Sequence, residues 1–349
     1  MTASTLTLVR PDDWHLHLRD GESLRAVVAA TARVFARAVV MPNLEPPVTT
    51  VVAAAAYRER IVGALPAGSR FAPLLTLYLT EQTTAEEIVR ARRSGFIAGV
   101  KYYPAGATTH SESGVRDISR VYPVLEEMQQ QNLPLLVHGE AIDPEIDIFD
   151  RERVFIERVL SRIVRDFPHL RVVLEHASTA EAVDFVTGAA SHIGATITPQ
   201  HLLWSRNALL AGRIRPHLYC MPVLKREKHR LALLRAATGG SPKFFLGTDS
   251  APHGRHAKES ACGCAGCYSA HAALELYAQA FESADALDRL EGFASFHGPD
   301  FYGLPRNRDK VTLRREAWKI PEEYPFAETS VVPLFAGELL HWRVEDASG

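Results

Sequence analysis

The sequence predicts an α/β fold of the (β/α)8 TIM-barrel type, and two observations support this prediction. Eight short apolar runs recur along the 349 residues, and mostly helical intervals separate them, which is the pattern of parallel βα units. Polar side chains follow most of these runs, as they do at the C-terminal mouth of such barrels. An open doubly wound sheet is the alternative fold, but no Gly-x-Gly-x-x-Gly turn follows the first run.

The predicted elements alternate regularly from the first residues to about residue 249. We expect strands at the opening alternation 5–9, which leads into 13–20, and then at 37–43, 71–79, 96–101, 133–138, 170–176, 193–198 and 243–249. We expect helices over 24–36, 51–65, 85–93, 121–131, 153–166 and 227–236. The remainder, 290–349, lacks this rhythm and is expected to be a C-terminal extension packed on the barrel, within a single domain that spans residues 1–349.

Composition narrows the class of protein. Residues counted as hydrophobic make up 46% of the chain, enough for a large buried core, and the formal net charge of -2 gives no electrostatic reason to bind nucleic acid or an anionic membrane. No apolar window approaches the ~18 residues of a membrane span, and the first residues do not read as a signal peptide. Four cysteines are too few for a disulfide framework. We therefore expect a cytoplasmic protein with a small-molecule substrate, and a homodimer remains possible.

The segment 13–20, Asp-Trp-His-Leu-His-Leu-Arg-Asp, is the most informative stretch of the chain. In an extended backbone His15, His17 and Arg19 share one face, because side chains alternate with a period of two. Two imidazoles on one face form a metal clamp of moderate specificity. Taken alone, the same pattern also fits two buried structural histidines.

The other strand ends add to this pair. The polar residues that end the runs are His15, His17, Asn43, Lys101, His138, His176 and Asp249. Four imidazoles and one carboxylate exceed the three protein ligands of a typical catalytic zinc ion, which indicates two metal ions. Two cations need an anionic bridge, and Lys101 could provide one after capture of carbon dioxide as N6-carboxylysine. Pairing of Lys101 with a rim carboxylate is the alternative.

Eight short motifs resemble those of the dihydroorotase family of the amidohydrolase superfamily, in its shorter, bacterial-type class. The resemblance extends from about residue 6 to 345 in consistent order. Its first motif, at 13–21, and Gly-Thr-Asp-Ser-Ala-Pro-His at 247–253 are specific, and the others mainly support them. Those others lie at 41–43, 99–101, 137–140, 174–176, 215–220 and 258–260.

The resemblance implies a zinc-dependent, reversible hydrolysis of (S)-dihydroorotate to N-carbamoyl-L-aspartate, a step of pyrimidine synthesis. It implies two zinc ions per subunit, with His15, His17 and Asp249 on the more buried ion. His138 and His176 would hold the more exposed ion, and carboxylated Lys101 would bridge the two. A hydroxide shared by the metals would be the nucleophile, with Asp249 as base and then acid.

The resemblance also implies a substrate-binding set, in which Arg19, Asn43 and His253 grip the substrate carboxylate. Backbone groups at Met221, where the family pattern has leucine, and at Ala265 would contact the ring, and His138 belongs to the same set. The small residues at 104–109 resemble the family's mobile loop, in which Thr108 and Thr109 close over the substrate.

Three alternatives remain open at this point. Cys262, Cys264 and Cys267 could form a second zinc site, although no fourth ligand is evident and a structural loop is favoured. Another cyclic-amide hydrolase, of the hydantoinase or dihydropyrimidinase type, would not need Arg19 and Asn43 to hold a ring carboxylate. A non-catalytic barrel that serves as a partner in a pyrimidine-pathway assembly would be expected to have lost part of the ligand set.

Overall fold

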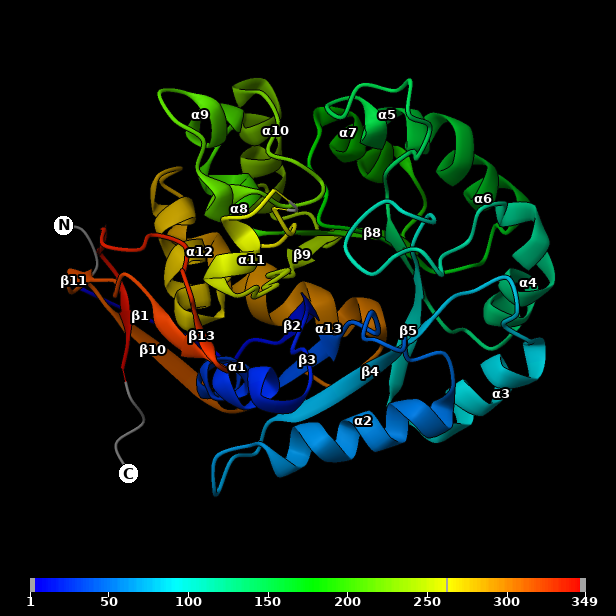
Figure 1. The fold of residues 1–349 in the computed structure, drawn as a ribbon, viewed down its shortest axis with the longest axis horizontal. Coiled ribbons are helices and arrows are strands. Elements are labelled where there is room, and N and C mark those ends of the chain that lie inside the picture. The colour runs from blue at the N-terminus through cyan, green and yellow to red at the C-terminus, as the bar shows by residue number, and fades with distance from the viewer. Residues whose placement is uncertain (1–3, 262, 346–349) are drawn as a thin grey trace.

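The protein, described here by a computed structural model over residues 4–261 and 263–345, is built around a ring of eight parallel strands with helices outside it (Figure 1). The strands follow one another around the sheet in chain order, so each pairs with its sequence neighbour, as predicted for a (β/α)8 barrel. They are β2 (Asp13–Leu16), β3 (Arg37–Val40), β4 (Ala72–Tyr78), β5 (Ile97–Tyr102), β6 (Leu135–His138), β7 (Val172–Glu175), β8 (Ile193–Ile197) and β9 (Phe244–Leu246).

Helices cover the outside of the ring and begin at local caps. Thr50, Thr84 and Thr179 each accept a hydrogen bond from a backbone N–H in the first turn of the helix that follows. The helices of the barrel are α1 (Gly21–Val34), α2 (Val51–Gly63), α3 (Ala85–Ser94), α4 (Tyr122–Gln130), α5 (Arg151–Phe155), α6 (Ser161–Asp166), α7 (Ala180–Gly188), α8 (Pro199–Leu203), α9 (Arg206–Leu210), α10 (Glu227–Thr238), α11 (Arg255–Lys258), α12 (Ala273–Glu282) and α13 (His297–Tyr302). A π-helical turn, Ile156–Leu160, joins α5 to α6, so the helix predicted over 153–166 is one continuous element of mixed type.

The ring closes where β2 meets β9, and individual hydrogen bonds make this closure instead of a regular β-ladder. The amide of His17 donates to the Ser250 carbonyl at 2.9 Å, and the amide of Asp249 donates to the His15 carbonyl at 2.8 Å. The Asp13 carboxylate accepts from the Thr248 amide at 2.9 Å and from the Thr248 hydroxyl at 2.6 Å. These bonds fix the ends of the two strands that carry three of the predicted site residues.

The opening strand was predicted in the wrong sheet. Residues 5–9 do form a strand, β1 (Thr5–Val9), but it pairs antiparallel with β10 (Lys310–Arg314), and the first barrel strand is β2 instead. Burial explains the difference, because β1 is largely exposed or half-buried, whereas every residue of β2 is buried, as a barrel strand requires.

The chain after α13 forms short antiparallel pairs beside β1. Its strands are β10, β11 (Trp318–Lys319), β12 (Tyr324–Phe326), β13 (Thr329–Val331), β14 (Leu339–Leu340) and β15 (Arg343–Val344). β10 pairs with β1 on one edge and with β15 on the other, so strands from both ends of the described chain belong to one three-stranded sheet (Figure 1). The boundary of the C-terminal extension at residue 290 stays a prediction.

The inside of the ring has its own apolar core. Trp14, Val39, Leu136, Val173 and Phe245, all at most 1% exposed, lie in one buried cluster. Tyr302 of α13 joins them, and its ring stacks on Trp14 with centroids 4.4 Å apart. Below the site the barrel is therefore packed solid, as expected for this fold. Across the described ranges, the structure has no helix with the length and apolar character of a membrane span.

Candidate active site

The carboxyl ends of the barrel strands converge on one small pocket. Most of the predicted site residues line it, together with Tyr103, Ala251 and Gly266, which were not predicted. The predicted residues are His15, His17, Arg19, Asn43, Thr108, Thr109, His138, His176, Met221, Asp249 and Ala265. The other two predicted residues, Lys101 and His253, are not among the lining residues. Lys101 contacts Glu175, and His253 contacts Arg19.

Three ligand-type side chains form the centre of the pocket. One ligand atom each from His15, His176 and Asp249 lies within 4.8 Å of the others, and all three residues are buried. Oδ1 of Asp249 is also 3.1 Å from Nε2 of His17, while Nδ1 of His176 has no hydrogen-bond partner among the described residues. Buried imidazoles grouped with a carboxylate, one of them with a nitrogen that has no hydrogen-bond partner, are a donor set that fits a metal cation.

The backbone holds two of these side chains in an uncommon conformation. Asp249 has φ of 43° and His176 has φ of 44°, in the left-handed region that non-glycine residues rarely adopt. The amide of His176 is held by the Thr196 hydroxyl at 2.8 Å, and that of Asp249 by the His15 carbonyl. Such conformations cost about 1–3 kcal/mol each and are concentrated at functional sites, where surrounding contacts maintain them.

Neighbouring side chains orient the histidines. Nδ1 of His17 donates to Oδ1 of Asn43 at 2.8 Å, which turns Nε2 of His17 towards Asp249. Nε2 of His138 lies 2.8 Å from Oε2 of Glu140, which leaves Nδ1 of His138 as the nitrogen able to bind a metal. A second hydrogen bond on the far nitrogen is the usual support of a metal-binding imidazole.

Lys101 lies beneath the pocket and is fully buried. Its ammonium group is in very short contact with Glu175, whose other carboxylate oxygen is 3.0 Å from Nδ1 of His15. Burial lowers the pKa of Lys101 from its usual value, which favours the neutral amine, although the charge of Glu175 opposes the shift. The structure thus shows Lys101 paired with a buried carboxylate on β7. The alternative stated from the sequence was pairing with a carboxylate at the rim of the barrel.

The protonation states also fit a cation. Burial lowers the pKa of His17 to about 4 and that of His176 well below its ordinary value, so both rings are neutral near pH 7. For His15, burial acts in the same direction, but Glu175 and Asp249 outweigh it and raise the pKa to about 9. The same carboxylates that stabilise a proton on His15 would stabilise a metal ion at that position, because the proton and the metal ion are both positively charged.

Arg19 and His253 lie together at one side of the pocket. Nε of Arg19 donates to the Pro252 carbonyl at 2.9 Å, and its Nη2 is 2.9 Å from Nε2 of His253. Burial and the charge of Arg19 lower the pKa of His253 to about 2, so His253 is neutral. The contacts with Pro252 and His253 thus hold the guanidinium of Arg19 in place. With His253 neutral, Arg19 carries the positive charge of this pair.

The segment with Thr108 and Thr109 covers the pocket. The side-chain amide of Asn43 donates to the Thr109 carbonyl at 3.2 Å, and Thr108 is tied to Ser111 within the segment. The free volume left inside is about 20 Å³, close to the space of a single water molecule.

Several residues that shape the site were not found from the sequence. Asp13 accepts a hydrogen bond from Thr248, next to Asp249. Glu140 orients His138, and Glu175 orients His15. Tyr103 lines the pocket with a buried hydroxyl that has no hydrogen-bond partner among the described residues. The signal that could have found three of them is adjacency, since Glu140, Glu175 and Asp13 lie within two residues of a predicted ligand.

The cysteine-rich loop is held by a buried lysine. Nζ of Lys258 donates to the carbonyls of Tyr219, Cys264 and Gly266 at 2.7–2.8 Å. Cys262 lies outside the described residues. Three backbone carbonyls held by one ammonium group favour the interpretation that the loop is structural and positions Ala265.

Comparison with known proteins agrees with this fold. The model of the amidohydrolase family matches residues 6–330, so the chain belongs to the amidohydrolase family. Within that family, its relatives are named dihydroorotase. One from Cupriavidus necator is 64% identical over 97% of this chain and 98% of its own length, and one from Nitrosococcus oceani is 63% identical over 98% and 99%. These similarities place the chain in the dihydroorotase branch.

Solved structures show the same relationship. The dihydroorotase of Campylobacter jejuni superposes with a TM-score of 0.90 at 34% identity, and covers 99% of this chain and 98% of its own. The dihydroorotase of Saccharomyces cerevisiae in complex with 5-fluoroorotic acid gives 0.90 at 32% identity, over 98% of this chain and 99% of its own. An L-hydantoinase from Arthrobacter aurescens, at 15% identity and a TM-score of 0.79, covers 97% of this chain and 82% of its own and shares the fold.

Proposed function

We propose that this chain catalyses the reversible interconversion of (S)-dihydroorotate and N-carbamoyl-L-aspartate, the third step of pyrimidine (UMP) synthesis. One observation carries the proposal: a buried cluster of imidazoles and a carboxylate shares a single pocket with the guanidinium of Arg19. The cluster suits opening of a cyclic amide, and the guanidinium suits the carboxylate on the ring.

The donor set supports binding of two zinc ions. His15, His17 and Asp249 would hold one ion and His138 and His176 the other, with Lys101, as its carbamate, between them. When bound, the ions supply an activated water and polarise the amide carbonyl. Formation of the carbamate needs a neutral amine, and the lowered pKa of Lys101 favours it.

Asp249 is the residue that we propose to move the proton. Its carboxylate is the acidic member of the central cluster, and the His15 carbonyl fixes its backbone. The pKa of Asp249 is well below its usual value, because His15 and His17 outweigh the effect of burial, so the group begins as a base. It would accept a proton as the ring amide is attacked and then deliver it to the leaving nitrogen.

Substrate recognition is proposed to depend on Arg19, with Asn43 and His253. Arg19 presents a charge that a cyclic amide without a carboxylate would leave unpaired. Met221 and Ala265 also line the pocket and would contact the ring through the backbone, and His138 would contact it as well. Thr108 and Thr109 would close over the bound substrate.

A hydantoinase or dihydropyrimidinase activity is the second candidate, because such enzymes share the barrel. A non-catalytic barrel is disfavoured, because every predicted ligand residue is present in the site. The test is turnover of L-dihydroorotate by the purified full chain, metal-replete and after chelation, with 5,6-dihydrouracil as the competing substrate. We expect chelator-sensitive turnover of dihydroorotate alone, whereas faster turnover of dihydrouracil would overturn the proposal.

The carbamate has a separate test. Native mass spectrometry of the metal-loaded chain should show an addition of one carbon dioxide that is lost together with the metals. An unmodified mass with two metals bound would contradict the carbamate and leave the metal site intact.

Three further expectations accompany the proposal. We propose that the chain acts in the cytoplasm and as a homodimer, and that residues 290–349 form an extension of a single barrel domain. Light scattering of the purified chain tests the dimer, and limited proteolysis near residue 290 tests the extension.

A further inference from the structure

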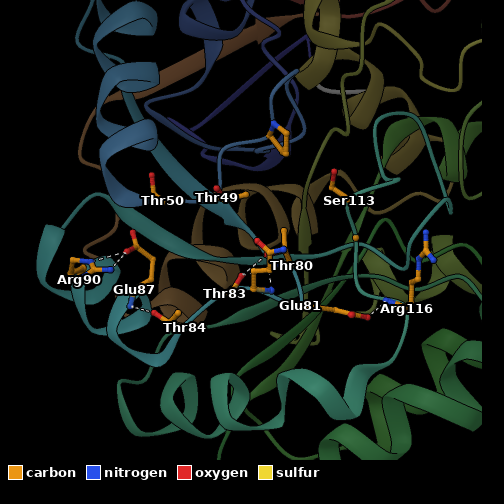
Figure 2. Close-up of a pocket in the computed structure, with 13 residues that line it drawn as sticks. Thr49, Thr50, Thr80, Glu81, Thr83, Thr84, Glu87, Arg90, Ser113 and Arg116 are labelled. Atoms are coloured by element: carbon orange, nitrogen blue, oxygen red, sulfur yellow. Dashed lines mark hydrogen bonds and ion pairs between the residues drawn. The ribbon is translucent and has the colours of Figure 1, made fainter.

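A hollow outside the active site has both of its carboxylates already paired. It lies between α2, α3 and residues 113–116, and its lining includes Glu81, Glu87 and Arg90 (Figure 2). Glu87 accepts from the Val51 amide at 2.6 Å and from Arg90 at 2.7 Å, and Glu81 accepts from the Arg116 amide at 3.1 Å. These groups need no ligand.

A second cavity, of about 290 Å³, differs in this respect. It lies among the start of α5, the start of α7, α9 and the start of α10, on the face where the barrel helices begin. Its lining residues do not overlap those of the active-site pocket. They are Asp147, Phe149, Asp150, Arg153, Thr179, Glu181, Arg206, Lys225, Arg226, Lys228 and His229.

The cavity carries a surplus of positive charge. Five lysine and arginine side chains line it against three carboxylates. Within residues 4–261 and 263–345, four of the five, Arg206, Lys225, Arg226 and Lys228, form no ion pair with a carboxylate, whereas Arg153 pairs with Glu157 at 3.0 Å. Among the lining residues alone, the cations outnumber the carboxylates by two.

Lys225 is the buried member of this group. It is 3% exposed, and its ammonium donates one hydrogen bond, to the Val223 carbonyl at 2.9 Å. An ammonium group has three donors, and a buried one is stable only when anions or acceptors compensate it. The charge of Lys225 acts to lower the pKa of two fully buried carboxyl groups, those of Glu140 and Glu152, so the fold compensates the ammonium group and fixes it as one wall of the cavity.

Helix α10 contributes further donors at the same place. It has 12 residues and begins at Glu227 without a side-chain cap, and both Arg226 and Lys228 beside that end line the cavity. His229 accepts from the Ala180 amide through Nδ1 at 3.0 Å, so its proton is on Nε2. Burial lowers the pKa of His229, which keeps it a neutral donor.

The cavity also has an apolar side. The Arg206 guanidinium lies over the Phe149 ring at 4.8 Å from its centroid. The volume is near the lower limit of small-molecule sites, about 300 Å³, and is larger than a phosphate group alone requires. A ligand with a phosphate on the cations and an organic part against Phe149 would use both features.

We propose that this cavity is a second ligand site, which binds the phosphate group of a small phosphorylated metabolite. A phosphate dianion suits the cations of the lining, and its several acceptor oxygens suit the donors of four groups: the fork of Arg206, the ammonium of Lys225, the α10 terminus and the imidazole of His229. A carboxylate has half the charge and fewer acceptors.

The test is calorimetric titration of the metal-loaded full chain with inorganic phosphate and with ribose 5-phosphate, in buffer without other oxyanions. The variant is Arg226→Ala with Lys228→Ala, which removes two exposed cations that line the cavity. The matched control is Arg25→Ala with Arg70→Ala, two exposed arginines outside the cavity, 69% and 83% exposed. Arg206→Gln is a second, single variant that leaves the α10 terminus intact.

We expect wild type and control to bind one phosphate each, and the cavity variant to bind at least tenfold more weakly, with turnover in the absence of phosphate unchanged. Tighter binding of ribose 5-phosphate than of phosphate would identify an organic part beside Phe149, and equal binding would limit recognition to the phosphate group. No saturation by about 10 mM phosphate would overturn the proposal. So would equal binding by the cavity variants and wild type, which is the result expected if phosphate binds only at the metal site.

Discussion

The bonds around Asp13 make a prediction about how the barrel closes beneath the site. The Asp13 carboxylate accepts from the amides of His15 and Thr248 at 3.1 and 2.9 Å and from the Thr248 hydroxyl at 2.6 Å. Replacement by alanine removes the two carboxylate oxygens and with them all three hydrogen bonds. Replacement by asparagine keeps one carbonyl oxygen for the two amides, and its NH2 group can donate to the hydroxyl oxygen.

The comparison of these two variants isolates the hydrogen bonds. Burial raises the pKa of Asp13 to about 7, so the wild-type carboxylate carries a desolvation cost that both variants remove. In Asp13→Ala the Thr248 hydroxyl can still turn to the His15 carbonyl at 3.3 Å, so two buried amides are left without an acceptor. At about 1–3 kcal/mol for each, Asp13→Ala should be less stable than Asp13→Asn by about 2–6 kcal/mol.

The assay is equilibrium urea denaturation of the metal-loaded variants at pH 7.5, with recovery of the signal on dilution as a check of reversibility. Turnover is measured alongside, because the same bonds hold Asp249. We expect Asp13→Asn to retain more of the wild-type turnover than Asp13→Ala does. Equal urea midpoints for the two variants, with equal slopes, would refute the claim that these acceptors hold the closure.

Three further predictions concern the site and its surroundings. Asp249→Asn should lower turnover by about 10²–10⁴-fold, because the proton carrier is lost, while far-UV circular dichroism stays unchanged; near-normal turnover would rule out this role. Arg19→Ala should mainly raise KM for dihydroorotate, by about 10- to 100-fold, because a charged hydrogen-bonding group is worth about 1.5–3 kcal/mol, and an unchanged KM in steady-state kinetics would contradict carboxylate binding. Burial lowers the pKa of His271 to about 3, so the folded chain binds fewer protons than the unfolded chain below pH 6.5, and stability falls on acidification. The free energy of unfolding of His271→Gln should therefore fall less steeply on acidification than that of wild type. The two slopes should differ by about 1.4 kcal/mol for each pH unit between 6.5 and 3, and parallel curves would argue against a lowered pKa of His271.

The order of the barrel strands and the position of the predicted ligands could be predicted from the sequence because both depend on local patterns. Apolar runs and the intervals between them define βα units, and a polar residue at the end of a run reaches the mouth in any parallel barrel. His138 and His176, nearly 40 residues apart, were expected at one site on this ground, and their rings lie 4.8 Å apart.

The placement of the first strand could not be predicted in the same way. Residues 5–9 and 13–16 are both short and partly apolar, and the pattern does not say which one enters the ring. The choice depends on β10, about 300 residues later, which offers β1 an antiparallel partner, and on the closure bonds of Asp13. Such pairing is set by tertiary contact and leaves no local signal.

By itself, the sequence determined the fold class and indicated which residues reach the mouth of the barrel, because residue type and strand position decide both. The tertiary structure decided which carboxylate meets which imidazole. Glu175 between Lys101 and His15, Asn43 beside His17 and the cluster of cations around Lys225 all join elements that are distant in the chain. Buried charge must be compensated within a few ångströms, and only the packed structure shows where compensation is complete and where it is left to a ligand.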